Sequence, residues 1–250
     1  MQEYWKSYMK PIDEKPAIVA FNASAGDYAP DFEHMYAAFV KVKLQRPKEN
    51  GLITQEEGDD ISFIEDRIEF ESLRYRSGKY IGRIISDGYV TFIYYLKLDF
   101  EWQNTVKDAM QHFSNYSYEF GSRTDAQWEI YKRLLFPTAK QWQIISNHHT
   151  CNKLKEQNDN LYIPRAIEHK AYFKTIEARH SFEQTIKKEG FTIQKQTTVP
   201  FNDTIIYGII FYRTDNPFYY DIDELTLHLI DISTQFDGDY DGWECSLVKK

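Results

Sequence analysis

The chain spells one order of segments twice, and this order limits its fold more than any other feature of the sequence. Apolar residues that recur every two residues indicate a strand, and those that recur every 3.6 residues indicate a helix. By this criterion each half has the order strand, helix, strand, strand, helix, strand. The predicted strands are 35–44, 79–86, 89–98 and 116–121, then 163–173, 191–199, 203–212 and 239–248. The predicted helices are 54–75, 102–113, 175–189 and 222–236.

This order predicts an α+β protein of two tandem ferredoxin-like (βαββαβ) antiparallel α/β sandwiches. Right-handed crossovers would give each sheet the strand order 4-1-3-2, with both helices on one face. A predicted β-hairpin over residues 3–22 precedes the first sandwich. Pro137 interrupts a helical pattern that runs from 125 to 158, and proline ends helices, so the expected domains are 1–136 and 137–250.

Two local patterns give sharper structural expectations. Thr54 followed by Glu57 predicts a helix N-cap with a glutamate at the third helical position. The third strand of each repeat is apolar on both faces, whereas an antiparallel sheet covered only by its own helices would show one polar face. We therefore expect both second faces to be covered, by the 125–158 helices, by the neighbouring domain or by a partner.

Composition excludes several functional classes. Thirty Lys and Arg stand against 38 Asp and Glu, a net charge of −8, which is the wrong sign for gripping a phosphate backbone. The two cysteines cannot form a disulfide framework. No run of residues approaches the ~20 apolar residues of a membrane span, and the start of the chain lacks the apolar core of a signal peptide. We expect a cytoplasmic protein that contacts neither membrane nor nucleic acid.

Short motifs carry a resemblance to two known families. In the second repeat they are Tyr162, Ile167-Glu168-His169, Lys188-Glu189-Gly190-Phe191 and Tyr240-Asp241-Gly242-Trp243. This half resembles the regulator of ribonuclease activity B family. In the first repeat they are Gly51-Leu52 and Gly82-Arg83-Ile84-Ile85-Ser86-Asp87-Gly88. That half resembles the domain family DUF695, and Trp128-x-x-Tyr131 with Leu135-x-Pro137 resembles the segment joining the two domains in tandem members.

The resemblance implies a regulatory protein that works by being bound. Its namesake binds an endoribonuclease, ribonuclease E, without chemistry of its own, so the resemblance implies a protein partner of that kind, no enzymatic activity and no cofactor. The candidate interaction residues are Arg165, Glu168, His169, Tyr240, Asp241 and Trp243. Strict alternation along the last strand places Trp243 and Tyr240 on opposite faces. For Trp243 and His169 a purely structural role is the alternative. The oligomeric state stays open.

Other functions remain as alternatives. The chain could be a hydrolase or small-molecule-binding enzyme with a site at the domain junction, which His148 or His169 beside a carboxylate would favour. Aromatics in 207–212 could stack RNA bases, although the acidic balance opposes this. Asp237 to Gly242 imitates the start of a calcium loop, but Val248 stands where the chelating glutamate belongs. His148, His149 and Cys151 are too few ligands for zinc.

Overall fold

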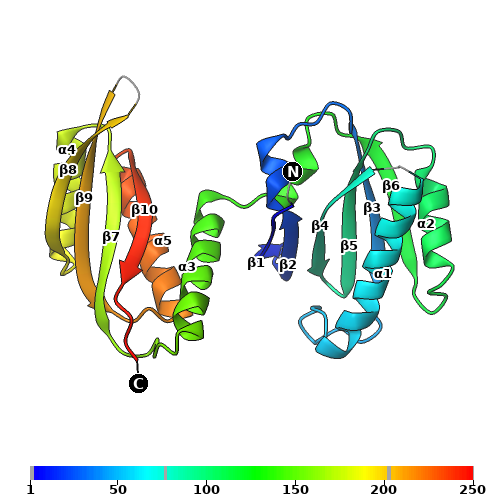
Figure 1. Ribbon diagram of the computed structural model, residues 1–250, viewed down its shortest axis with the longest axis horizontal. Coiled ribbons are helices and arrows are strands. Elements are labelled where there is room, and N and C mark those ends of the chain that lie inside the picture. The colour runs from blue at the N-terminus through cyan, green and yellow to red at the C-terminus, as the bar shows by residue number, and fades with distance from the viewer. Residues whose placement is uncertain (1–2, 76–77, 202–203, 250) are drawn as a thin grey trace. The chain divides into compact units, whose positions relative to one another are not determined.

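The first of two sheets has six antiparallel strands in the order β1-β2-β4-β5-β3-β6. The structure is a computed structural model that describes residues 3–75, 78–201 and 204–249, and it divides into two units, 1–137 and 138–250. The strands of the first unit are β1 (Trp5–Ile12), β2 (Lys15–Asn22), β3 (Tyr36–Lys43), β4 (Gly78–Ser86), β5 (Tyr89–Leu96) and β6 (Tyr118–Thr124). Its helices are η1 (Ala23–Asp27), α1 (Gln55–Arg74), α2 (Trp102–Met110) and the π-helical turn η2 (Tyr131–Leu135) (Figure 1).

The second sheet has four antiparallel strands in the order β10-β7-β9-β8. Its elements are α3 (Ala139–Glu156), β7 (Arg165–Phe173), α4 (Ile176–Lys188), β8 (Thr192–Phe201), β9 (Thr204–Asp215), α5 (Tyr219–Gln235) and β10 (Gly238–Cys245). This is the 4-1-3-2 order, and β6-β3-β5-β4 repeats it in the first unit, where β2 adds the β1–β2 hairpin to β4. The predicted fold class is confirmed. The predicted strand residue Asp203 lies outside the described residues.

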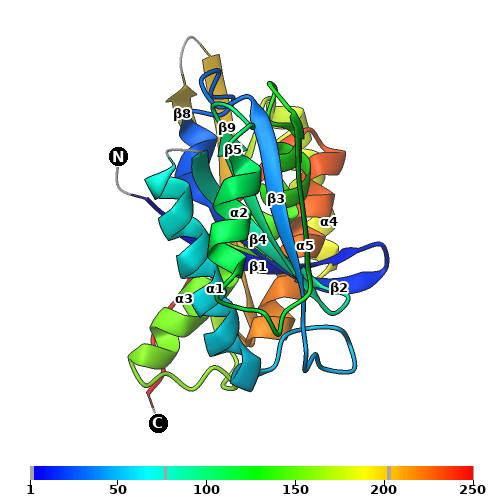
Figure 2. The same cartoon turned by 90° about the vertical axis from the view of Figure 1, so that its right-hand side faces the viewer.

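Helices α1 and α2 run side by side over one face of the first sheet (Figure 2). Ile61, Ile64 and Ile68 recur at helical spacing along α1 and are fully buried against Val40 and Phe92 in the same apolar cluster. Among the described residues no helix is long and apolar enough to cross a membrane. The first core therefore forms where the buried stripes of α1 and α2 meet one face of the sheet.

The start of α1 differs from the sequence expectation. Thr54 is the N-cap residue by backbone geometry, but its side chain makes no capping hydrogen bond. Glu57 instead turns inward, where its carboxylate accepts hydrogen bonds from the backbone N–H groups of Gln45 (2.6 Å) and Arg46 (2.8 Å). The predicted N-cap residue and the glutamate at the third helical position are confirmed. The Glu57 carboxylate does not cap the helix, because the loop after β3 offers it two donors.

The second face of the first sheet is covered by residues 128–136, called here the strap. The Trp128 ring stacks on Tyr95 with centroids 3.9 Å apart, and its indole N–H donates to the His34 carbonyl at 2.8 Å. Leu135 packs over Gly82, where a Cβ would lie 3.0 Å from the leucine side chain. The expectation that this face is covered is confirmed for the strands that the strap contacts. Because the strap packs on one side of β5 and the helices on the other, β5 is apolar on both sides.

In the second unit, α4 and α5 cover one face of the sheet (Figure 1). Phe173, Phe182, Phe211 and Leu229 are fully buried between these helices and the strands. Of the three covers expected for the other face, α3 does not provide one here, because it packs along α5. Cover by the neighbouring domain or by a partner stays a prediction. Polar contacts between α3, α5 and β10 explain this placement.

Candidate interaction site

The Tyr240-Asp241-Gly242-Trp243 motif forms a β-bulge on the edge strand β10. Tyr240 pairs with Ala171 and Gly242 with Lys170, so Asp241 is the extra residue, and Gly242 has a φ of +125°. Tyr240 and Trp243 therefore both point to the helix-covered side of the sheet, where they pack on its core. The prediction of opposite faces was wrong because a bulge shifts the alternation by one residue.

His169 is fully buried beneath this motif. Its Nδ1 lies 2.8 Å from the Tyr240 hydroxyl, and its ring stacks on Phe211 with centroids 5.5 Å apart. Burial, and to a lesser degree the Arg213 charge, lowers the pKa of His169 to about 3. The imidazole is therefore neutral at pH 7 and is far from the pKa that suits a general acid or base.

Arg165 anchors the start of β7. Its guanidinium donates to the Asp159 carboxylate at 2.6 Å and to the carbonyls of Asn160 and Ser246 at 2.7 and 3.0 Å. Both side chains of the Arg165–Asp159 pair are buried. The pair joins the end of the loop before β7 to the chain after β10, so Arg165 holds the two neighbouring strand ends together.

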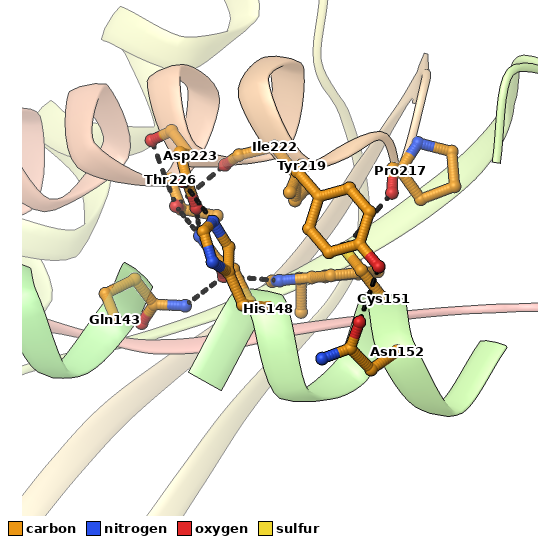
Figure 3. Close-up of polar contacts among 11 residues, drawn as sticks. Gln143, His148, Cys151, Asn152, Pro217, Tyr219, Ile222, Asp223 and Thr226 are labelled. Atoms are coloured by element: carbon orange, nitrogen blue, oxygen red, sulfur yellow. Dashed lines mark hydrogen bonds and ion pairs between the residues drawn. The ribbon is translucent and has the colours of Figure 1, made fainter. Parts of the chain in front are cut away.

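Asn147 on α3 is the centre of a buried polar network. Its amide oxygen accepts from the Trp243 indole at 2.7 Å and from Gln143 at 2.8 Å. Its amide nitrogen donates to Asp223 and to Thr226, both at 2.8 Å. All four hydrogen-bonding positions of this side chain are used. The network joins β10, α3 and α5, and Figure 3 shows Gln143 on α3 facing Thr226 and Asp223 on α5.

A histidine–carboxylate pair closes the outer side of this network. His148 Nε2 lies 2.8 Å from Asp223 Oδ2, and the His148 side chain is 46% exposed. Cys151, one turn along α3, is fully buried and donates to the Pro217 carbonyl. Burial raises the pKa of the Cys151 thiol to about 12, so the thiolate that a nucleophile needs is absent at neutral pH. Within the described part of the chain, no three His, Cys, Asp or Glu side chains are grouped to hold a metal ion.

The six candidate residues do not form one surface. Tyr240, His169 and Trp243 meet on the helix-covered side, and Arg165 is buried. Asp241 is exposed at the bulge. Glu168 lies on the opposite side of the sheet and pairs in register with Glu244, next to Lys170.

Sequence reasoning missed the network around Asn147. The available signal was the presence of polar residues within apolar helical stripes. Thr226 follows Leu225 and precedes Leu229 on the buried side of α5. Asn147 lies between the buried positions Ile145 and Cys151 on α3.

Comparison with models of known protein families shows which family this chain belongs to. The model of a family of unknown function, DUF695, matches residues 3–136, more than half of the chain. The chain belongs to the DUF695 family. In tandem with this DUF695 match, the model described as regulator of ribonuclease activity B matches residues 144–245. Both expected resemblances are confirmed, and the second match spans Asn147, Asp223 and the Asp241 bulge.

More distant comparisons add little to the DUF695 assignment. No curated protein matches the chain. A solved protein of unknown function from Galdieria sulphuraria is 10% identical, with a TM-score of 0.24 over 84% of this chain and 97% of its own. A putative glycine cleavage system transcriptional repressor is 8% identical, with a TM-score of 0.27 over 85% and 98% of the two chains. At such TM-scores neither similarity carries an argument about function.

Proposed function

We propose that this protein is a non-catalytic, cytoplasmic regulator that binds an endoribonuclease through the β10 side of its second unit. The proposal rests on one observation: the two side chains of this region that could act in catalysis, His169 and Cys151, are buried and in unreactive protonation states. His169 and Cys151 are buried, with pKa values of about 3 and about 12, and both are used to brace β10 and α3. The match of residues 144–245 to a regulator of ribonuclease activity supports a ribonuclease as the partner.

The accessible part of the proposed site is the bulge and its surroundings. Asp241 is exposed, and Trp243 is half-buried beside it. An aromatic side chain held at a fixed position next to exposed charge is the usual composition of an interface anchor. In this proposal the buried residues Tyr240, His169 and Arg165 hold the strand in place, and the partner contacts Asp241 and the exposed part of Trp243. Glu168 lies on the other face of the sheet, outside this contact.

An RNA cleavage assay tests the proposal. A purified ribonuclease E-type endoribonuclease cleaves a reporter RNA, and its rate and products are compared with and without the full chain. We expect the chain to bind the enzyme and to alter its cleavage of a reporter RNA. Asp241→Lys should weaken binding about tenfold because it reverses the charge at the bulge. Glu177→Lys, an exposed acid at the start of α4, should have no effect. Unchanged cleavage and no complex at micromolar concentration would contradict the proposal.

The same experiment separates the alternative functions. Binding of the reporter RNA by the chain alone would favour RNA recognition, although Phe211, one of the central-strand aromatics, is fully buried. Among the described residues, the His148–Asp223 pair is the observation that favours an enzyme. Turnover of a small molecule by the chain, lost in His148→Gln, would replace the regulatory proposal.

A further inference from the structure

Strand β6 forms a free edge of the first sheet. In the described part of the chain β3 is its only neighbouring strand, and the two pair antiparallel over all seven residues of β6 without a register shift. A strand at the edge of a sheet presents a row of unpaired backbone N–H and C=O groups to any other strand that reaches it. The edge of β6 is therefore a template for the addition of another strand.

The backbone groups on this edge belong to the even-numbered residues. Just before β6 the Lys43 N–H donates to the Ser117 carbonyl at 2.9 Å, and just after it the Asp125 N–H donates to the Met35 carbonyl at 2.7 Å. Hydrogen-bonded and non-bonded pairs alternate along an antiparallel ladder, so the odd-numbered residues of β6 bond to β3. The residues whose N–H and C=O groups point outward are therefore Tyr118, Phe120, Ser122 and Thr124.

The other three edge strands have features that hinder pairing. Strand β1 contains Pro11, β8 contains Pro200 and a register shift after Ile193, and β10 has the Asp241 bulge. Proline residues and bulges are common means by which proteins protect a sheet edge. Because β6 contains neither a proline nor a bulge, it is the edge best suited to pair with another strand.

The charges on β6 are complementary to themselves. Glu119 and Arg123 lie on the same face of the strand, two residues to either side of Gly121. Both side chains are exposed, and among the described residues neither lies within the 4.0 Å of an ion pair from an opposite charge. When a second β6 runs antiparallel to the first, the acid of each strand can therefore face the base of the other.

We propose that β6 pairs antiparallel with β6 of a second copy of this chain, about a two-fold axis at Gly121. In this register Phe120 of each copy faces Ser122 of the other, and both residues have the outward backbone groups that a hydrogen-bonded pair needs. Glu119 faces Arg123 in a non-bonded pair, where side chains come closest. The two six-stranded sheets would become one continuous sheet. The proposal is independent of the ribonuclease proposal for the second unit.

The same charges select this register. Since even-numbered residues must face even-numbered residues, one copy can slide along the other only in steps of two residues. A slide of one step takes Glu119 away from Arg123, and a slide of two steps places Glu119 opposite Glu119 or Arg123 opposite Arg123. Like charges directly opposite each other are destabilising, so the register centred on Gly121 is favoured.

Sedimentation of the full chain at several concentrations tests the proposal. We expect a dimer with a dissociation constant on the order of 10 μM. Glu119→Arg and Arg123→Glu should each weaken it at least tenfold, because the two-fold axis repeats each new like-charge pair. The double variant exchanges the two charges and should restore the dimer. Asp66→Lys makes the same change of charge at an exposed position on α1, and it should have no effect.

Amide hydrogen exchange measures the pairing residue by residue. In the dimer the outward amides of Phe120 and Ser122 should be protected, and they should lose this protection on dilution below the dissociation constant. The Gly121 amide, which bonds to β3, should stay protected in both states. Glu119 and Arg123 are exposed, so their variants should keep the other amide signals of the wild type.

Three results would overturn the proposal. The first is a monomer at every concentration up to about 1 mM. The second is a dimer that the single charge reversals weaken no more than Asp66→Lys does, or that the double variant does not restore. The third is a dimer in which the Phe120 and Ser122 amides exchange as fast as in the monomer, which would place the interface elsewhere.

Discussion

At the scale of single residues, the second unit is marked by polar side chains that are buried and engaged with one another. His169, Asn147 and Arg165 are each less than a tenth exposed. Removing one member of such a group leaves its partners unsatisfied in a medium that cannot solvate them, and this costs more than the hydrogen bond contributed. These residues therefore set the stability of the surface that Asp241 and Trp243 present.

Acidification should destabilise the second unit through His169. Its pKa is about 3 in the folded state against an ordinary value of 6.5, so between these values the unfolded chain holds a proton that the folded chain lacks. The contribution is fully present above pH 6.5, and the free energy of unfolding should fall by about 1.4 kcal/mol per pH unit below it. Amide hydrogen exchange of β7 and β9 from pH 7.5 to 5 measures this.

The matched comparison is His169→Gln, which cannot titrate and should show a flatter dependence on pH. His149→Gln changes an exposed histidine on α3 and should keep the slope of the wild type. A wild-type slope equal to that of His169→Gln would show that the histidine is not buried in its neutral form.

Trp243 and Asn147 should be energetically coupled. Asn147→Ala leaves the indole N–H and Asp223 without their 2.7 and 2.8 Å partners, so we expect a loss of about 2–4 kcal/mol in the free energy of unfolding. Trp243→Phe should cost less. The double variant should be more stable than the sum of the single losses by about 1 kcal/mol. If urea unfolding shows that the two single losses in the free energy of unfolding simply add in the double variant, the hydrogen bond between Trp243 and Asn147 is contradicted.

At the scale of elements, two backbone irregularities determine which side chains lie on which face of each sheet and how far that face is covered. The β10 bulge turns Tyr240 and Trp243 to the same side, and the strap turns an otherwise open sheet face into a half-covered one. Both depend on unusual backbone, since Gly242 has a φ of +125° and Trp128 a φ of +56°. Each can be tested by a substitution with a matched control.

Gly242→Ala should destabilise the second unit through the backbone alone. A Cβ at this position would meet nothing within 4 Å, yet φ is +125°, a region that costs L-residues about 1–3 kcal/mol. Gly58→Ala is the control, because that site in α1 is equally open and helical, and alanine there should stabilise by up to about 1 kcal/mol. Thermal unfolding of both variants measures the difference, and loss of stability in neither or in both would contradict it.

Trp128→Ala should strongly destabilise the first unit. The side chain is fully buried, stacks on Tyr95 and donates to the His34 carbonyl, so its loss should cost about 3–5 kcal/mol. Trp5→Ala removes an indole that is 37% exposed, and should cost much less. Exchange of the β5 amides reports the effect. If the two variants are equally stable, the strap is not part of the first core.

At the scale of the whole molecule, each unit has its own apolar core. One cluster contains Val40, Ile64 and Phe92, and the other contains Phe173 and Phe211. A domain that buries its own core can fold by itself. The chain therefore consists of two sandwiches of the same fold with different surfaces: the first has a sheet face partly covered by the strap, and the second has the Asp241 bulge.

Residues 138–250 should fold without the first unit. We expect the isolated segment to show dispersed amide signals and slow exchange in β7 and β9, because the His169 and Asn147 contacts all lie within it. An unfolded spectrum under conditions in which the whole chain is folded would move the domain boundary or show that the two domains need each other.

The sequence by itself determined the order of elements, the class of fold and the family. Ile61, Ile64 and Ile68, or Leu225, Leu229 and Ile232, repeat with helical spacing, and such spacing is a local property that any reader of the chain can count. Short motifs such as Tyr240-Asp241-Gly242-Trp243 were sufficient for the tandem resemblance that the family models confirm.

Only the tertiary structure decided which side chains meet. Asp241 moves the alternation of β10 by one residue. The Glu57 carboxylate accepts from two amides of the loop after β3, and Asn147 on α3 binds side chains of α5 and β10. The physical reason is that periodicity records the average environment of a segment. A bulge or a buried hydrogen bond depends on partners that the chain brings together only when it has folded.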